Sequence, residues 1–245
     1  MASRAIAFAS SKGHELAGRL DLPADAPRAW AIFAHCFTCS KDSKAAAYLS
    51  QGLAARGVAV LRFDFTGLGA SGGNFASSTF SANVDDLCAA ADFLRREHSA
   101  PALLVGHSLG GAAVLAAARR LAEARAVATI GAPFEPRHVA HLVKDGKVEI
   151  GGRPFAVDPS FLEDLERHDP AKAIAELGKA LLVMHSPRDA VVGIDNAARI
   201  FQAAKHPKSF LSLDDADHLL LRREDALYAA DVLAAWASRF ISTPS

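Results

Sequence analysis

The sequence has little of the features that mark several specialised classes of protein. Its 245 residues carry 27 Lys and Arg against 27 Asp and Glu, so the formal net charge is zero. This balance argues against an extended surface for nucleic acid or acidic lipid. Three cysteines are too few, and odd in number, for a secreted disulfide scaffold. The content of 51% hydrophobic and 22% charged residues is that of an ordinary globular protein, whose core needs no disulfide or metal.

Segments that would direct the chain to or across a membrane are also scarce. The first residues (MASRAIAFAS) include one Arg but no apolar stretch, so we expect no signal peptide. Apolar runs such as residues 112–118 fall far short of the ~20 residues that a membrane span needs. No Asn-x-Ser/Thr glycosylation site is present. We therefore expect no membrane span and a location in the reducing cytoplasm.

Short apolar runs alternate with longer segments of helical period. The runs are apolar at nearly every position, as strands buried on both faces are: 30–35, 58–63, 102–106, 126–130 and 180–185. Five amphipathic segments are predicted helices: 43–56, 83–97, 109–124, 194–205 and 224–240. This alternation predicts an α/β fold with a mostly parallel sheet and helices on both faces. Residues 5–8 and 15–22 predict an antiparallel hairpin and 208–213 a late strand, which gives about eight strands.

One region, from about residue 134 to 178, interrupts this alternation. It has no clear buried strand, but a Gly151-Gly152 turn predicts a hairpin between residues 148–150 and 154–157. A short helix is predicted over 159–167. The region is too short to bury a core of its own. We therefore expect a single α/β domain over residues 1–245 with a cap insertion at about 134–178.

The motif with the clearest chemical meaning is G-H-S-L-G at residues 106–110. A G-x-S-x-G motif occurs by chance in roughly one of ten to fifteen chains of this length, so its context matters. It lies between a predicted strand and an Ala/Leu-rich helix, as a nucleophile elbow requires. The strained turn at the serine needs small residues two positions before and after it, and both are glycine. This pattern predicts Ser108 as a nucleophile, with a helix-capping serine as the alternative.

A nucleophilic serine needs a base, and the base needs an acid that orients it. Asp189 follows the predicted strand 180–185 through a short turn, and His218 follows the last strand. With Ser108, both would lie at the carboxyl edge of the sheet, where open α/β sheets place their sites. Glu135 is the alternative acid. Three other histidines end predicted strands and are more simply groups beside the site: His35, His107 and His185.

An oxyanion needs two backbone N–H donors in such a site. We expect one from Leu109, directly after the nucleophile, and the other from Phe37, in the loop after residues 30–35. Cys36 and Cys39 flank Phe37. Zinc would need further ligands, and a thioredoxin-like motif would need a different fold, so we expect these cysteines to shape the loop. Their position predicts that modification of their thiols inhibits the protein.

Five stretches together resemble the α/β-hydrolase superfamily along nearly the whole chain: FAHCFTCSKD, RFDFTGLGASGG, LLVGHSLGG, LLVMHSPRDAVV and LDDADHLL. HCFTCSKD, IDNAARIF and ADHLL resemble, more narrowly, bacterial hydrolase domains that are often fused to an OsmC-like domain. That second domain is not part of this sequence, so the chain is either a stand-alone relative or a piece of a fused protein. The resemblance implies an esterase-type serine hydrolase. A dehalogenase would carry Asp, and a dienelactone hydrolase Cys, in place of Ser108. The chain departs from the family pattern at Cys36, where Gly is common.

These residues predict a carboxylic-ester hydrolase that needs no cofactor and no metal. Ser108 attacks the acyl carbon, His218 takes and returns the proton, and Asp189 fixes the imidazole. A thioesterase, peptidase or acyltransferase on the same triad is the alternative, and a non-catalytic binding protein is the third. The expected partner is a small, uncharged acyl ester and not nucleic acid, while a homodimer is left open. Three side chains of the cap insertion are candidates to line an acyl pocket, with packing onto the core as the alternative: Phe155, Phe161 and Leu162.

Overall fold

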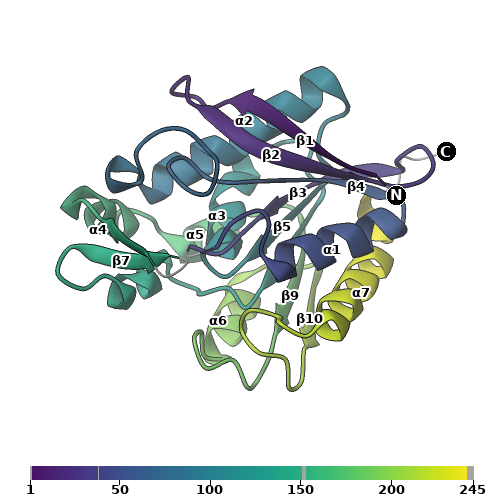
Figure 1. Cartoon of the computed structure of the whole chain (residues 1–245). Helices are drawn as coiled ribbons and strands as arrows, with labels where there is room; N and C mark the ends of the chain where they lie inside the picture. The colour runs from purple at the N-terminus through teal and green to yellow at the C-terminus, as the bar shows by residue number, and fades with distance from the viewer. Residues whose placement is uncertain (1, 38, 151–152, 242–245) are drawn as a thin grey trace.

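The computed structural model describes residues 2–37, 39–150 and 153–241. Within these residues the centre of the molecule is an eight-stranded sheet in the order β1-β2-β4-β3-β5-β6-β9-β10 (Figure 1). Its strands are β1 (Ala2–Ala9), β2 (Glu15–Leu22), β3 (Ala29–Ala34), β4 (Val58–Phe63), β5 (Leu103–His107), β6 (Ala126–Ile130), β9 (Ala180–His185) and β10 (Lys208–Ser212). In this order, β2 pairs antiparallel with both β1 and β4, and all the remaining neighbours in the sheet pair parallel. The predicted α/β-hydrolase fold is confirmed.

The central strands are the apolar runs of the sequence. Every residue of β3, β4, β5, β6 and β9 is buried, because helices cover both faces of this part of the sheet. The edge strands are different: most of β1 is exposed, and β10 is only half buried. The carboxyl ends of the parallel strands therefore meet along one edge of a rigid, fully packed layer.

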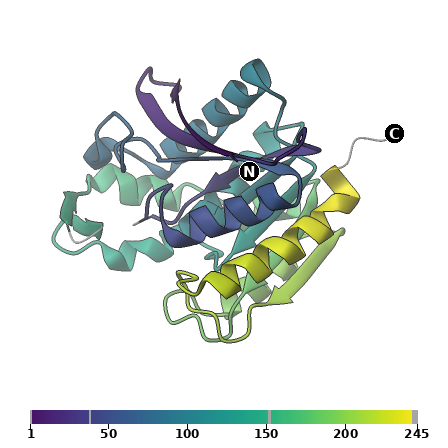
Figure 2. The same cartoon turned by 45° about the vertical axis from the view of Figure 1, so that its right-hand side comes forward.

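Two layers of helices enclose this sheet. α1 (Lys44–Ala55) and α7 (Arg223–Ile241) cover one face and lie side by side in Figure 2. A β-carbon at Gly52 would lie 2.6 Å from that of Ala230, so the glycine lets the two helices approach closely. The other face packs against α2 (Phe80–Glu97), α3 (Leu109–Ala117) and α6 (Asp195–Ala203). α3 is shorter than predicted, because the 3-10 turn η2 (Ala118–Arg120) follows it.

Residues 131–179, between β6 and β9, are here called the inserted segment. It contains a 3-10 turn, a hairpin and two helices: η3 (Pro136–Leu142), β7 (Lys147–Ile150), β8 (Arg153–Ala156), α4 (Pro159–Glu166) and α5 (Pro170–Ala175). The hairpin and α4 agree with the sequence prediction, whereas α5 was not predicted, and the Gly151-Gly152 turn lies outside the described residues. Val148, Phe161 and Ile174 join the apolar cluster beneath α2 and α3. The inserted segment thus shares the main core.

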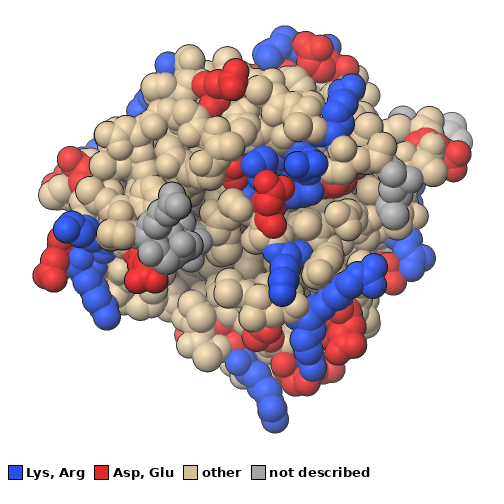
Figure 3. All heavy atoms as spheres, in the orientation of Figure 1, with Lys and Arg blue, Asp and Glu red and all other residues tan. Residues whose placement is uncertain are grey.

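The surface carries charges of both signs. Figure 3 shows Lys and Arg interspersed with Asp and Glu over one face, with most of that face formed by other residues. This mixture is the spatial counterpart of the equal charge counts in the sequence. Among the described residues, no helix has both the length and the apolar character to cross a bilayer.

Candidate active site

Ser108 occupies a sharp turn between β5 and α3. Its backbone φ of 54° lies in the left-handed region, which costs a non-glycine residue about 1–3 kcal/mol and persists only where its surroundings hold it. A β-carbon at Gly106 would lie 2.3 Å from the carbonyl oxygen of Gly110. One at Gly110 would lie 2.3 Å from the carbonyl oxygen of Ala34. The two glycines of the motif therefore permit the elbow that the sequence predicted.

A chain of hydrogen bonds connects the three residues proposed from the sequence. His218 Nε2 lies 3.1 Å from Ser108 Oγ, and His218 Nδ1 lies 2.7 Å from Asp189 Oδ2. The carboxylate accepts only, so Nδ1 carries the proton and Nε2 accepts from the serine hydroxyl. Ser108 is 7% exposed and His218 is 9% exposed. Both reacting side chains are therefore buried, and only a small fraction of each is in contact with solvent.

Asp189 is held as a carboxylate by its surroundings. Its Oδ1 accepts the backbone N–H groups of Val191 and Val192 at 2.9 and 2.8 Å. Burial alone would raise its pKa, but the hydrogen bond from His218 and those from the two amides hold the pKa below its usual value. The alternative acid, Glu135, pairs instead with Arg137 and Arg199 at the surface. The structure thus brings together Ser108, His218 and Asp189, and not Glu135.

The two predicted oxyanion residues lie on neighbouring segments. Phe37 follows β3, and Leu109 begins α3. The close approach of Gly110 to the carbonyl oxygen of Ala34 brings these segments together. Phe37 and Leu109 also line the same small cavity. Leu109 directly follows Ser108 in the sequence, and the shared cavity brings Phe37 close to Leu109.

The loop that carries Phe37 is fixed at two points. Cys36 and Cys39 form a disulfide with their α-carbons 5.1 Å apart, and Thr38 lies outside the described residues. The sequence analysis did not predict this bond. It consumes both thiols, so inhibition by thiol reagents at this loop requires prior reduction. Further along, Lys41 binds the fully buried Asp64 twice, through its backbone N–H at 2.7 Å and its Nζ at 2.9 Å.

Aromatic rings cover the same side of the site. The ring of Phe37 stacks on that of Phe161 of α4, with centroids 5.2 Å apart, and it contacts Phe75 at 5.6 Å. Phe75 in turn contacts Phe155 of β8. Phe161 is buried, and Phe155 and Leu162 pack partly buried against the core. Phe161 therefore seats the inserted segment on the loop of Phe37, whereas Phe155 contacts Phe75 and Leu162 packs against the core.

Three buried histidines each donate a hydrogen bond to a loop of the site. His35 Nδ1 binds the carbonyl oxygen of Cys36 at 2.7 Å, and His107 Nε2 binds that of His218 at 2.7 Å. His185 Nε2 binds the carbonyl oxygen of Val192 at 2.8 Å. Burial lowers the pKa of His107 to about 4 and also lowers that of His35. Their position at strand ends was visible in the sequence, but the carbonyl oxygens that they bind were not.

Comparison with known proteins agrees with this geometry. A family model described as "Serine aminopeptidase, S33" matches residues 25–153, which is more than half of the chain. The crystal structure of the esterase domain from a Rhodothermus marinus protein is 50% identical, covers 99% of this chain and 100% of that chain, and superposes with a TM-score of 0.86. The chain belongs to the serine hydrolases of the α/β-hydrolase superfamily.

Solved structures of lower sequence identity share the fold of this chain. Est1E from Butyrivibrio proteoclasticus, solved with ferulic acid bound, is 17% identical over 96% of this chain and 99% of that chain, with a TM-score of 0.83. XC6422 from Xanthomonas campestris, described as an α/β serine hydrolase without lid, is 20% identical over 99% of this chain and 97% of that chain, with a TM-score of 0.70. No curated protein matches the sequence.

Proposed function

We propose that this serine hydrolase cleaves carboxylic esters, with Ser108 as nucleophile, His218 as general base and acid, and Asp189 as the orienting acid. The observation that carries the proposal is the hydrogen-bonded chain from Ser108 Oγ through His218 to Asp189 at a nucleophile elbow. The similar Rhodothermus marinus domain is described as an esterase, which supports an ester as the substrate.

The reaction takes two steps. Ser108 Oγ bonds to the acyl carbon while its proton passes to His218 Nε2, and the negative charge that forms on the carbonyl oxygen accepts the N–H groups of Phe37 and Leu109. The bond from the acyl carbon to the alcohol oxygen then breaks, and that oxygen takes the proton from His218. Water then loses a proton to His218 and bonds to the acyl carbon, the bond from that carbon to Ser108 Oγ breaks, and Oγ takes the proton back from His218 as the acid leaves. Apart from the substrate and water, every group in these steps belongs to this chain.

The carboxylate of Asp189 sets the tautomer and the charge of His218 during this reaction. It fixes the proton on Nδ1 and stabilises the imidazolium that forms after the serine loses its proton. The amides of Val191 and Val192 orient the carboxylate. We place one domain over residues 1–245, in which the inserted segment acts as a cap that covers the acyl side through the contact of Phe161 with Phe37.

A peptidase is the second candidate, because the matching family model is described as a serine aminopeptidase. An aminopeptidase needs an acidic group that binds the free amine of its substrate. Glu135 of the inserted segment is already paired with Arg137 and Arg199. Glu135 is therefore not a free acceptor for such an amine.

The experiment that tests the proposal is hydrolysis of p-nitrophenyl acetate by Ser108→Ala. We expect turnover to fall by about 10⁴-fold or more, because the covalent step is lost. Ser3→Ala, at an exposed serine of β1, is the matched control and should be unchanged. Near wild-type turnover in Ser108→Ala would overturn the proposal. Faster cleavage of amino-acid p-nitroanilides than of the ester would favour the peptidase.

A further inference from the structure

The exposed large apolar side chains are concentrated at the site. Among the described residues there are six: Val191, Ile194, Phe210, Leu219, Leu221 and Tyr228. Four of them lie on the two loops that carry Asp189 and His218, and these four are here called the apolar rim (Val191, Ile194, Leu219 and Leu221). Scattered exposed apolar residues are normal on a protein surface, but a cluster of them beside a reactive centre marks a binding surface.

The two loops of the apolar rim are neighbours in space. The bond between Asp189 and His218 joins them, and Ser186 Oγ donates to the carbonyl oxygen of Asp214 at 2.9 Å. Both views of the fold show the loops side by side beyond β9 and β10 (Figures 1 and 2). Val191 is two residues from Asp189, and Leu219 directly follows His218. The apolar rim therefore borders the acid and base of the triad.

Hydrogen bonds fix the backbone of the loop after β10 so that Leu219 and Leu221 face outward. The carboxylate of Asp217 accepts the N–H of Leu219 at 2.8 Å and that of Leu221 at 3.3 Å. Leu220 between them has a φ of 48° and is buried in the core beneath α1 and α7. This backbone turns one leucine inward and leaves its two neighbours 41% and 53% exposed.

The loop after β9 has the same pattern. The carboxylate of Asp189 accepts the N–H groups of Val191 and Val192. Val192 is buried, whereas Val191 is 43% exposed. Since both loops expose apolar side chains from a hydrogen-bonded backbone, the exposure is a property of the folded site and not of a loose chain end.

The direction of proton transfer shows which part of an ester meets this surface. His218 returns its proton to the oxygen of the departing alcohol, so that oxygen must lie within hydrogen-bond reach of Nε2. On the loop of the proposed oxyanion donor Phe37, by contrast, the ring of Phe37 is in contact with those of Phe161 and Phe75. The alcohol part of the substrate therefore leaves along the two loops of the apolar rim.

We propose that the apolar rim binds the alcohol part of the substrate, and that the enzyme prefers esters of uncharged, apolar alcohols of several carbons. This inference rests on the proposed function. Nearby acidic groups are already engaged: Asp217 binds backbone amides, and Asp215 pairs with Arg222 at 2.9 Å.

Two series of esters test the proposal on the wild-type enzyme. In acetates of methanol to octanol, kcat/KM should rise with the length of the alcohol, by up to about fourfold for each methylene that becomes fully buried. In ethyl esters of acetate to octanoate, kcat/KM should stay level or fall. A rise in the acyl series alone, or a preference for alcohols that bear a carboxylate, would overturn the proposal.

Substitutions in the apolar rim test whether the preference for longer alcohols arises there. The readout is the ratio of kcat/KM for hexyl acetate to that for ethyl acetate, because a ratio cancels general damage to the site. We expect the Val191→Ser/Leu219→Ser double variant to lower the ratio by about 5- to 20-fold. Phe210→Ser on β10 and Tyr228→Ser on α7, at the two exposed apolar residues outside the apolar rim, should leave the ratio and the activity unchanged. An unchanged ratio in the double variant would contradict the proposal.

The outcomes also separate this inference from the proposed function. If Ser108→Ala abolishes ester hydrolysis but the double variant keeps the hexyl-to-ethyl ratio, the triad stands and the alcohol site is wrong. If wild-type enzyme hydrolyses no ester, the proposed function fails first. A wild-type dimer on size exclusion that Leu221→Ser dissociates would show that a second copy covers the apolar rim, and would overturn the proposal.

Discussion

The two sides of Ser108 differ in how tightly they are closed. On the oxyanion side, the loop of Phe37 is fixed by a disulfide, by the bonds of Lys41 to buried Asp64, and by the ring of Phe161. On the triad side, the loops of Asp189 and His218 leave valine and leucine side chains exposed. In the proposed reaction, the loop with the most fixed contacts is therefore the one that holds the negative charge, and the loops with exposed apolar side chains are those that meet the alcohol. Preorganised donors at the developing charge usually supply the largest catalytic contribution.

The largest expected loss of activity comes from a change at Asp189, on one of the loops with exposed apolar side chains. Asp189→Asn should lower kcat by about 10⁴-fold, because an amide can hold the imidazole in the wrong tautomer. Initial rates on p-nitrophenyl acetate measure the change. Glu135→Gln, which removes a carboxylate paired with Arg137 and Arg199 at the surface, is the control and should change kcat by less than about twofold. Equal losses in the two variants would contradict the assignment of the acid.

A smaller loss of kcat is expected when the loop of Phe37 loses one of the contacts that fix it. The Nζ of Lys41 lies 2.9 Å from Asp64, and its removal in Lys41→Met leaves a buried carboxylate without its cation. We expect kcat to fall by about 10- to 100-fold with little change in KM, since the loop of Phe37 moves and its oxyanion donor is misplaced.

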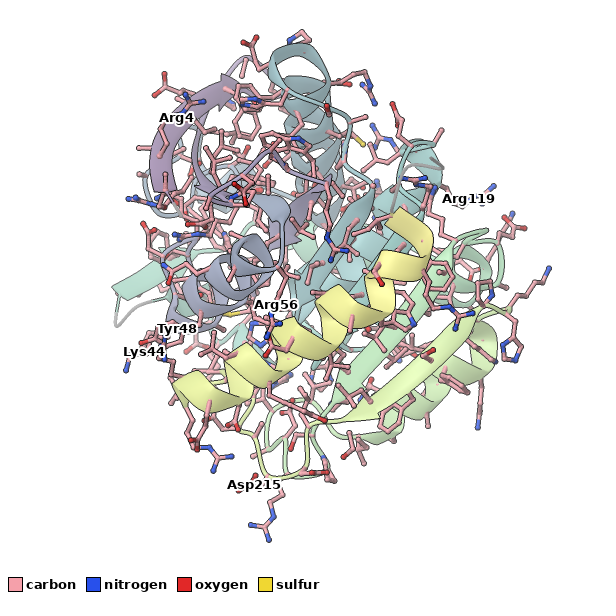
Figure 4. All side chains as sticks on the ribbon, turned by 90° about the vertical axis from the view of Figure 1, so that its right-hand side faces the viewer. Arg4, Lys44, Tyr48, Arg56, Arg119 and Asp215 are labelled. Atoms are coloured by element: carbon pink, nitrogen blue, oxygen red, sulfur yellow. A yellow bond between two sulfur atoms is a disulfide. The ribbon has the colours of Figure 1, made fainter. Side chains whose placement is uncertain are left out.

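Arg56→Met provides the control for Lys41→Met. Arg56 directly follows α1 (Figure 4), and its exposed side chain pairs with Asp231 of α7. Loss of this pair should cost less than about 1 kcal/mol of stability and leave kcat unchanged. A Lys41→Met enzyme that is destabilised but keeps its kcat would show that the bonds to Asp64 serve the fold and not the oxyanion loop.

The buried histidines predict how stability depends on pH. The folded pKa of His107 is about 4, against 6.5 in the unfolded chain. Below pH 6.5 the unfolded state therefore binds a proton that the folded state does not, so the free energy of unfolding falls as the pH drops from 6.5 toward 4. His107 accounts for a loss of about 2 kcal/mol by pH 5.

Urea unfolding at pH 7 and pH 5 measures this loss. In His107→Gln the amide can still donate to the carbonyl oxygen of His218 but does not titrate, so the fall between the two pH values should shrink by about 2 kcal/mol. His98→Gln, at a much less buried histidine that ends α2, is the comparison and should change the fall less. The same fall in wild type and His107→Gln would refute a buried, neutral His107.

The smallest expected effect comes from opening the packing around Phe37. Phe161→Ala removes the ring that stacks on Phe37. We expect kcat/KM for ethyl octanoate relative to ethyl acetate to rise by about 3- to 10-fold, because the vacated space admits a longer acyl chain. Phe240→Ala, at the end of α7 beside Trp236, is the control. No change in acyl preference would place the acyl chain elsewhere.

Much of this arrangement could be predicted from local sequence. Strands buried on both faces are continuous apolar runs, and Gly106 and Gly110 mark the elbow because nothing larger fits there. Contacts between distant segments could not be predicted in the same way. Neither the bonding of Lys41 to Asp64 nor that of His107 to the carbonyl oxygen of His218 leaves a periodic signal. The spacing of Cys36 and Cys39 permits a disulfide without requiring one, and α5 is too short to show a helical period.

The most direct test of the central claim is covalent labelling by a fluorophosphonate probe followed by peptide mapping. A fluorophosphonate reacts with a serine only when a base activates the hydroxyl and donors hold the oxygen of the adduct. The account predicts one equivalent of label on the peptide that contains Ser108, with no labelling in Ser108→Ala and much slower labelling in Asp189→Asn. Label on another residue, or equal labelling of wild type and Ser108→Ala, would contradict it.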